Sequence, residues 1–141
     1  MSGTAPTGLS GGDTMVTIEQ LEQFYSHLQQ YDDGIDPVEC AKRDMQSMQN
    51  PWQHIHCKEI PHGWICYQAQ PLAYYVHNLW VDPGYRGQGI GKKLLQLVPT
   101  DEPTTLFVYN KNPAKQFYEH LGFRKKEDYL NDSIQMIRFY G

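Results

Sequence analysis

A glycine-rich turn near the middle of the chain has the residues best suited to chemistry. Residues 81–95 read VDPGYRGQGIGKKLL, with Gly87, Gly89 and Gly91 within five residues. Glycines let the backbone approach an anion closely, and the amides of residues 88–92 are expected to lie unpaired in the first turn of a helix. Together with the positive end of the helix dipole, such amides can hold a pyrophosphate. The turn is therefore predicted to bind a phosphate group.

The segment after the turn is predicted to be an amphipathic helix. Its apolar residues recur at i, i+4, i+7 and i+8, which places them on one helical face for docking on a sheet. These residues are Ile90, Leu94, Leu97 and Val98. Since an apolar run precedes the turn, the whole unit is interpreted as strand, loop and helix.

Two common phosphate-binding loops are excluded by the spacing. A P-loop requires G-x-x-x-x-G-K-S/T, but Gly89 is followed by Ile90, and the pair Gly91 and Lys92 is followed by Lys93. The Rossmann pattern G-x-G-x-x-G is also missing, because the three glycines of the turn are evenly spaced. Neither ATP binding by a P-loop nor dinucleotide binding is expected.

A second block with a distinct pattern lies further along the chain. Residues 108–123 read VYNKNPAKQFYEHLGF. The end of an apolar strand is followed by Asn112 as a helix N-cap, Pro113 at the first helical position and Gly122 as the C-cap. The block therefore predicts a strand that leads into a short helix.

The two blocks, in this order, resemble two segments of the GNAT N-acetyltransferase superfamily. Arg86, Gly89 and Gly91 match its pyrophosphate-loop pattern Gln/Arg-x-x-Gly-x-Gly/Ala, and the second block matches its F-Y-x-x-L-G-F ending. The resemblance covers about residues 72–123. It implies one α+β domain of GNAT type, with a mixed, mostly antiparallel central sheet and helices on both faces. This domain is expected over residues 15–141, after a disordered tail over residues 1–14.

The resemblance also implies an activity and a co-substrate. A primary amine of a small molecule or peptide would attack the thioester of acetyl-CoA directly, and no metal would take part. The backbone of the strand before the turn would meet the pantetheine amides, and Arg86 would orient the turn or reach a phosphate. The implied cofactor-binding residues are Leu79, Trp80, Val81, Arg86, Gly87, Gln88, Gly89, Ile90, Gly91, Lys92 and Asn112. The asparagine that contacts the pantetheine in this family would fall at Lys111, so Asn112 either does this through a shifted turn or only caps its helix.

Two side chains are candidates for proton transfer. By resemblance, Tyr118 aligns with the tyrosine that in many GNAT enzymes lies beside the thioester sulfur, and a phenol with a pKa near ~10 can donate to a thiolate at neutral pH. The alternative is that Tyr118 only packs its ring. The strand before the turn offers Tyr74, Tyr75 and His77 as bases, of which His77 is the best because it titrates near neutrality. The alternative for His77 is a histidine hydrogen-bonded within the sheet.

The other elements follow from caps and periodicity. A capping box at Thr17 predicts a helix over residues 18–31, and Asp36 is the predicted N-cap of a second helix that stops before Pro51. The loop over residues 31–36 would wall the acceptor site, where its aspartates either attract a cationic acceptor or simply end and cap the helices. Strands are predicted at residues 53–60, 64–70, 72–82, 104–109 and 133–140.

Composition excludes several other functions. The net charge is -4 and no basic stripe is present, which argues against a nucleic-acid partner. No stretch of about 18 consecutive apolar residues occurs, so no membrane-spanning helix is predicted. Three cysteines, an odd number, fit reduced thiols in the cytoplasm. The histidines and cysteines at positions 54, 56, 57, 62 and 66 lack the paired spacing of zinc ligands, so no metal site is expected.

One rival function shares the same fold. A catalytically idle acyl-CoA-binding module, acting as a sensor or regulator, would have the same phosphate-binding turn. The two functions differ in whether an open acceptor site lies beside Tyr118 and a base.

Overall fold

Six strands form one sheet in the computed structural model, which describes residues 13–140. The strands are β1 (Ile55–Ile60), β2 (Gly63–Gln70), β3 (Ala73–Val81), β4 (Thr104–Tyr109), β5 (Arg124–Tyr129) and β6 (Ser133–Arg138). Their spatial order is β1-β2-β3-β4-β6-β5, and every neighbouring pair is antiparallel except β3 and β4. The predicted α+β class with a mixed, mostly antiparallel sheet is confirmed.

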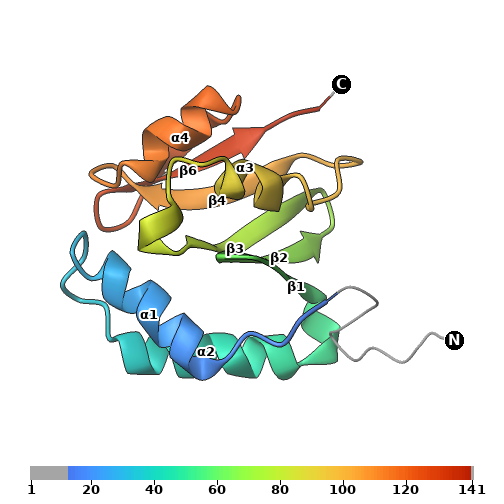
Figure 1. The fold of residues 1–141 in the computed structure, drawn as a ribbon. Coiled ribbons are helices and arrows are strands. Elements are labelled where there is room, and N and C mark those ends of the chain that lie inside the picture. Colours follow the sequence, from blue (N-terminus) through green and yellow to red (C-terminus); the bar gives the residue numbers. More distant parts are fainter. Residues whose placement is uncertain (1–12, 141) are drawn as a thin grey trace, which may run out of the picture.

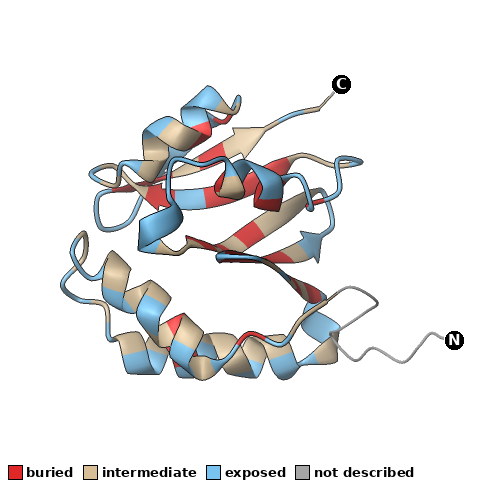
Figure 2. Ribbon diagram, viewed as in Figure 1, coloured by how far each residue is buried: buried red, intermediate tan, exposed pale blue. Residues whose placement is uncertain are grey.

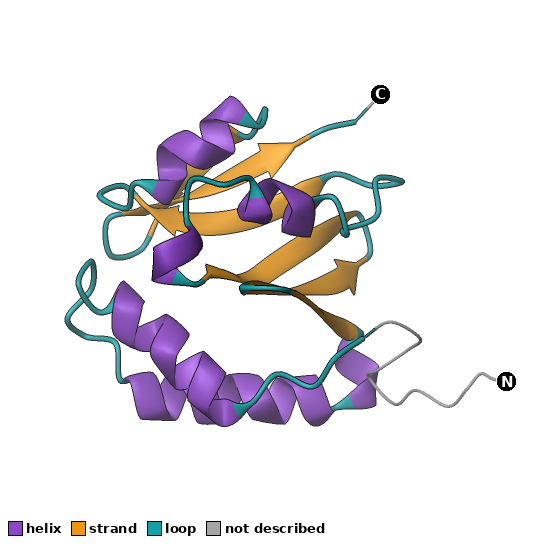
Figure 3. Cartoon of the chain, in the orientation of Figure 1, coloured by secondary structure: helices purple, strands orange, loops and turns teal. Residues whose placement is uncertain are grey.

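Helices cover both faces of this sheet, as predicted (Figure 1 and Figure 3). They are α1 (Ile18–Leu28), α2 (Pro37–Gln49), α3 (Ile90–Leu95) and α4 (Ala114–His120), with short 3-10 turns at Pro51–Gln53 and Pro83–Tyr85. The first two helices lie together on one face, and α3 and α4 lie on the other. Within residues 13–140, no helix has both the length and the apolar character that crossing a bilayer requires.

The first two helices begin where their caps predict. Thr17 and Gln20 form the complete capping box, and the Asp36 carboxylate accepts hydrogen bonds from the amides of Val38 and Glu39. The first helix ends at Leu28, three residues before the predicted end, because the chain tightens into a turn in which the Tyr31 amide donates to the Leu28 carbonyl.

Each face of the sheet has its own hydrophobic core (Figure 2). Successive side chains of β2 point to opposite faces of the sheet and so contribute to both cores. Ile65 faces α3 and α4, while Trp64 and Cys66 face α1 and α2. Leu94 and Leu106 lie in the first core, here called the α3–α4 core. The second core, called the α1–α2 core, includes Val16, Leu21, Ala41, Ile55, Cys57 and Trp80.

A β-bulge interrupts β3 beside one of the predicted site residues. Cys66 of β2 pairs with Asn78, but the next residue, Tyr67, pairs with Val76, so His77 is the extra residue. The bulge changes the alternation of the strand: Leu79 packs on the same core as Val76, although an odd number of positions separates them.

The central strands separate next to this bulge. β3 pairs with β4 at Tyr74 with Thr104 and at Tyr75 with Thr105, and no further pairs follow. From Val76 onward, the edge of β3 that faces β4 therefore has no strand partner. This separation produces the gap in which the site described below lies.

Three features differ from the sequence-based expectations. The strand β5 was not predicted, since its sequence RKKEDY lacks apolar alternation and all six residues are exposed at the sheet edge. Leu97 does not belong to the buried helical face, because α3 ends at Leu95 and Leu97 is exposed. Residues 1–12 of the predicted tail lie outside the described residues, whereas Asp13 and Thr14 contact β1 through Lys58 and Cys57.

Candidate functional site

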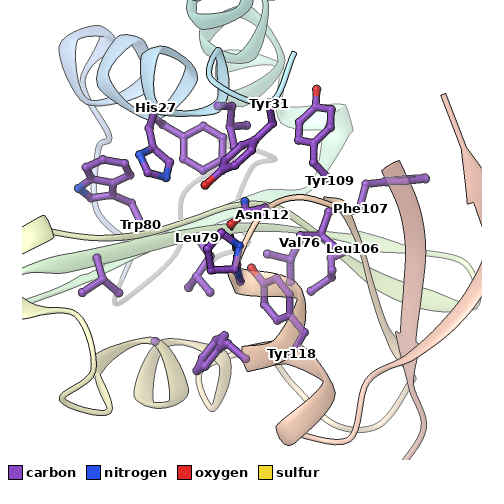
Figure 4. Close-up of a pocket in the computed structure, with 18 of the residues that line it drawn as sticks. His27, Tyr31, Val76, Leu79, Trp80, Leu106, Phe107, Tyr109, Asn112 and Tyr118 are labelled. Carbon is purple, nitrogen blue, oxygen red and sulfur yellow. Dashed lines mark hydrogen bonds between the residues drawn. The ribbon is translucent and has the colours of Figure 1, made fainter. Parts of the chain in front are cut away.

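A cavity of about 940 Å³ opens where β3 and β4 separate. Its lining comes from the glycine turn, β3, β4, the start of α4 and the end of α1 (Figure 4). Sites for small molecules commonly have volumes of about 300–1,000 Å³. The cavity therefore has the size to hold an extended ligand, and it brings together segments that are far apart in the sequence.

The glycine turn lies at one end of the cavity with its amides unpaired. Gly87 and Gly89 have φ angles of 81° and 84°, which favour glycine. Within the described chain, the N–H groups of residues 86–92 donate no hydrogen bond, whereas the Lys93 amide donates to the Gly89 carbonyl and continues the helix. All the predicted residues of the turn line the cavity except Gln88.

Arg86 braces the turn against β3. Its Nε donates a hydrogen bond to the carbonyl of Val81 at 2.9 Å, and its guanidinium lies 4.9 Å from the centre of the Trp80 ring. Both contacts hold the segment after the 3-10 turn close to the end of β3. Arg86 was expected either to orient the turn or to reach a phosphate. The structure shows contacts of the first kind.

The strand residues Leu79, Trp80 and Val81 follow next along the cavity wall. Each pairs with β2 on one side, and the edge toward β4 lacks a strand partner. Such an edge offers main-chain donors and acceptors to a ligand. The Trp80 side chain turns away from the α3–α4 core and packs among Phe24 and His27 of α1.

Asn112 is at the start of α4, on the cavity wall. Its side-chain oxygen accepts a hydrogen bond from the Ala114 amide at 2.9 Å, so it caps the helix as the sequence predicts. The described helix begins at Ala114, one residue after the predicted first position, Pro113. Gly122 has a φ of 94° and ends the helix as expected.

Tyr118 reaches the cavity from α4 (Figure 4). Its ring packs against Phe117 and Phe123, with centroids 5.4 and 5.6 Å away, and its side chain is buried. Burial raises the pKa of the Tyr118 phenol well above its ordinary value, so the hydroxyl stays protonated at neutral pH. No group in the described chain hydrogen-bonds this hydroxyl. The ring thus packs in the core, as the alternative expected, while the residue also lines the cavity.

His77 lines the cavity from the bulge of β3. Its Nε2 is 2.8 Å from the side-chain oxygen of Gln68 on β2, so Nε2 carries the proton and Nδ1 holds a lone pair. Burial lowers the pKa of His77, against a smaller opposing effect of the Asp44 carboxylate. The contact with Gln68 matches the alternative expected from the sequence, a histidine that is hydrogen-bonded within the sheet. It leaves the Nδ1 atom of His77 without a partner among the described residues. Of the other two candidate bases, Tyr75 lines the cavity and Tyr74 does not.

Further aromatic residues complete the cavity, and the motif analysis missed them. Tyr31 and His27 come from the end of α1 and the loop after it, and Tyr109 and Phe107 come from β4 (Figure 4). The Tyr31 and Tyr109 rings stack 6.2 Å apart. A usable signal was the alternation of the strand over residues 104–109, which places Phe107 and Tyr109 on the face opposite Leu106 and Val108.

The aspartates after α1 have the structural roles that the sequence left open. The Asp32 carboxylate accepts hydrogen bonds from the Tyr109 hydroxyl and the Gly34 amide, at distances of 3.0 Å each. Asp36 caps α2, as described above. Neither of these two residues, nor Asp33, lines the cavity. The predicted wall from this loop is instead formed by Tyr31.

No group of three or more possible metal-ligating side chains lies together among residues 13–140. Cys57 and Cys66 face each other across β1 and β2, buried in the α1–α2 core. His54, by contrast, precedes β1 in a left-handed conformation with a φ of 54°. Of these positions, Cys57 and Cys66 thus come together in one core, whereas His56 stacks on Tyr67 of the other core.

Comparisons with known proteins agree with this architecture. A family model described as acetyltransferase (GNAT) domain matches residues 52–125, more than half of the chain. Among the curated proteins, no sequence matches this chain.

Solved structures with the same fold include several acetyltransferases. One of the GNAT family from Staphylococcus aureus has a TM-score of 0.66 and 21% identity, and the match covers 86% of this chain and 91% of that one. An acetyltransferase from Thermus thermophilus has a TM-score of 0.65 and 20% identity, with 87% and 92% covered. The PaiA N-acetyltransferase from Thermoplasma acidophilum, solved in complex with coenzyme A, has a TM-score of 0.61 and 17% identity, with 90% and 97% covered.

At these identities the structural matches show a shared fold, and the family model adds the match in sequence. The described site has the glycine turn, the separated strands and the tyrosine of the second block in one cavity. On this evidence the chain belongs to the GNAT acetyltransferase family.

Proposed function

We propose that this protein transfers the acetyl group of acetyl-CoA to a primary amine of a small molecule or peptide, by direct attack of the amine. The observation that carries the proposal is the continuity of the cavity, which runs from the unpaired amides of the glycine turn through the separated strands to Tyr118 and His77. The coenzyme A in the Thermoplasma acidophilum structure supports the same co-substrate here.

The residues of the turn and of β3 fit this co-substrate. The amides of residues 86–92 and the Lys92 side chain would hold the diphosphate, since unpaired main-chain donors and a cation both favour an anion. The free edge of Leu79, Trp80 and Val81 would pair with the amides of the pantetheine arm. When bound, acetyl-CoA supplies an acetyl group activated as a thioester.

Two side chains that line the cavity would handle protons. An alkyl amine with a pKa near ~10.4 must lose a proton before it can attack, and Nδ1 of His77 would accept that proton. The Tyr118 phenol, kept protonated by burial, would donate its proton to the departing thiolate. The attacking nitrogen loses a second proton as the amide forms, and this proton would restore the phenol. No covalent bond to the protein is required.

An assay of thiol release from acetyl-CoA with a panel of primary amines tests this function. We expect amine-dependent release of free thiol by the wild-type chain and the matching acetylated amine in the products. If coenzyme A binds by calorimetry but no amine is acetylated, the protein is an idle acyl-CoA-binding module and the proposed activity is wrong. If coenzyme A does not bind, both functions fail.

A further inference from the structure

We propose that Cys57 and Cys66 form a redox modification site, at which hydrogen peroxide converts the two thiols into a reversible disulfide between β1 and β2. This inference goes beyond acetyl transfer and does not depend on it. Three observations carry it. They are the pairing of the two residues across the strands, the distance between their sulfur atoms, and a small cavity that reaches Cys57 from the surface.

The two cysteines occupy directly opposite positions on neighbouring antiparallel strands. β1 is at the edge of the sheet, and the Cys57 carbonyl accepts a hydrogen bond from the Thr14 amide on the side away from β2. Because the N–H and C=O groups of a strand residue point the same way, Cys57 and Cys66 form a non-hydrogen-bonded pair. The Cα atoms of such a pair are typically about 4.5 Å apart, within the range of about 4.4–6.8 Å that a disulfide spans.

The two side chains point toward each other in the α1–α2 core. Their Sγ atoms are 2.7 Å apart, compared with about 2.05 Å in a disulfide bond. Both residues are free thiols, and both are buried. A small movement of the side chains is therefore enough to bring the two sulfurs to bonding distance, and β1 and β2 can keep their pairing.

A cavity of about 160 Å³ is lined by Cys57 and not by Cys66. Its other walls come from the segment before α1, the end of α2 and the start of β1. Met15 and Gln49 line it and are exposed, so its mouth is at the surface of the described chain. A water molecule takes up about 30 Å³ in the liquid, so the cavity has room for hydrogen peroxide, whereas a molecule as large as oxidised glutathione does not fit.

The position of the cavity assigns the first step to Cys57. Its sulfur, as a thiolate, would attack hydrogen peroxide, so that an S–O bond forms, the O–O bond breaks and hydroxide leaves. The sulfur of Cys66 would then attack the sulfenic acid on Cys57, which forms the S–S bond and releases the second oxygen as hydroxide. The two hydroxides take the two thiol protons. In total, two thiols are oxidised and one peroxide is reduced, giving one disulfide and two water molecules.

Cys66 is suited to the second step only. It is fully buried, and burial raises the pKa of its thiol, with a smaller contribution from its hydrogen bond to Cys57. A protonated thiol is a poor nucleophile toward peroxide. Beside the sulfenic acid, however, the departing hydroxide takes the Cys66 proton, and the contact between the two sulfurs makes the attack effectively unimolecular.

The third cysteine is too far along α2 to replace Cys66. Met48, near the end of α2, has its Sδ atom 3.9 Å from the Sγ atom of Cys57. Cys40 precedes Met48 by eight residues on the same helix. Since a helix rises 1.5 Å per residue, Cys40 lies about 12 Å further along the axis. Cys40 is therefore an internal control for the reaction.

The test treats the folded full chain with a slight molar excess of hydrogen peroxide and removes the excess with catalase. The chain is then unfolded, its remaining thiols are labelled with N-ethylmaleimide, and its peptides are mapped by mass spectrometry. We expect peptides joined through Cys57 and Cys66, and dithiothreitol should restore both thiols. Oxidised glutathione at the same concentration should give at least about tenfold less of this disulfide, because it cannot enter the cavity. Free thiols at both positions after peroxide treatment, a disulfide that includes Cys40, or an equal yield with oxidised glutathione would overturn the proposal.

Serine variants test the order of the two steps. Cys66→Ser should accumulate sulfenic and sulfinic acid at Cys57 at least about tenfold more than wild type, since no thiol attacks the first product. Cys57→Ser should leave the Cys66 thiol unoxidised, and Cys40→Ser, the matched control, should form the disulfide as wild type does. Oxidation of Cys66 in the Cys57→Ser variant, or an unoxidised Cys57 in the Cys66→Ser variant, would overturn the assigned order. The wild-type experiment decides the proposal even where a variant does not fold.

Discussion

Tyr118 combines a buried ring with a hydroxyl that has no hydrogen-bond partner in the described chain. Replacing it with phenylalanine removes only the hydroxyl and keeps the ring contacts with Phe117 and Phe123. We expect Tyr118→Phe to lower kcat by about 10²–10⁴-fold, the usual contribution of a general acid. The dissociation constant of coenzyme A, measured by calorimetry, should stay within about twofold, since the diphosphate contacts proposed above lie in the glycine turn. An unchanged kcat would show that Tyr118 only packs.

If His77 is the base, its pKa sets the pH at which kcat/KM falls on the acid side of the pH profile. The base must be neutral to accept a proton, and its neutral fraction rises as the pH rises through its pKa. Because burial lowers the pKa of His77, the acid limb of kcat/KM should have its midpoint below about pH 6.5. The His77→Gln variant should lower kcat/KM and lose this limb. A midpoint well above pH 6.5, or the same limb in the variant, would contradict the role of His77 as base.

At this scale, the sequence predicts residues that belong to motifs and misses the others. Tyr118 and Asn112 were found because each has a fixed place in a short pattern, and the structure places both on the cavity wall. Tyr31, Phe107 and Tyr109 belong to no motif. Their convergence depends on how the loop after α1 meets β4, which local periodicity does not encode.

The helices α3 and α4 pack closely against each other beside the site. A Cβ at Gly91 would meet the Phe117 ring at 2.9 Å, so this position requires glycine for packing. We expect Gly91→Ala to lower the free energy of unfolding by about 1–3 kcal/mol, because the ring must move. Chemical denaturation with a fluorescence readout measures this change.

Gly84→Ala is the matched control for that measurement. A Cβ at Gly84 would meet nothing within 4 Å, and its φ is not positive. We expect its free energy of unfolding to stay within about 0.5 kcal/mol of wild type, as for other surface substitutions. Equal stability of the Gly91 and Gly84 variants would contradict the packing argument.

Elements were predicted where local signals agree and missed where they are absent. The caps at Thr17 and Asp36 and the apolar strand at Thr104–Tyr109 fix their elements well. β5 lacks such a signal, because it forms only by pairing with β6 at the sheet edge. The bulge at His77 is equally invisible in the sequence, since it results from how β2 and β3 are paired.

The whole molecule is organised by one sheet that both cores share. Leu21 lies in the α1–α2 core and Leu106 lies in the α3–α4 core, and both are buried. Leu21→Ala and Leu106→Ala should each lower the free energy of unfolding by about 2–5 kcal/mol. Because β2 and β3 contribute to both cores, each variant should still unfold in a single transition, with fluorescence and circular dichroism curves that coincide. Separate transitions for the two faces would contradict a shared sheet.

At the scale of the molecule, the sequence predicted the fold class through its two blocks, and the family match agrees. The separation of β3 from β4 is a long-range property, because it depends on where the parallel pairing between these strands stops. The size and aromatic walls of the cavity follow from that separation. They could not be read from either block alone.

The central claim is that unpaired main-chain amides at the start of α3 grip the diphosphate of coenzyme A. Amide ¹H–¹⁵N spectra recorded during a titration with coenzyme A test it most directly, with pantetheine, which lacks the diphosphate, as the control ligand. We predict that coenzyme A shifts the amide signals of residues 86–92 and of Leu79–Val81, whereas pantetheine shifts only the β3 signals. Saturation with coenzyme A that leaves the signals of residues 86–92 unchanged would contradict the claim.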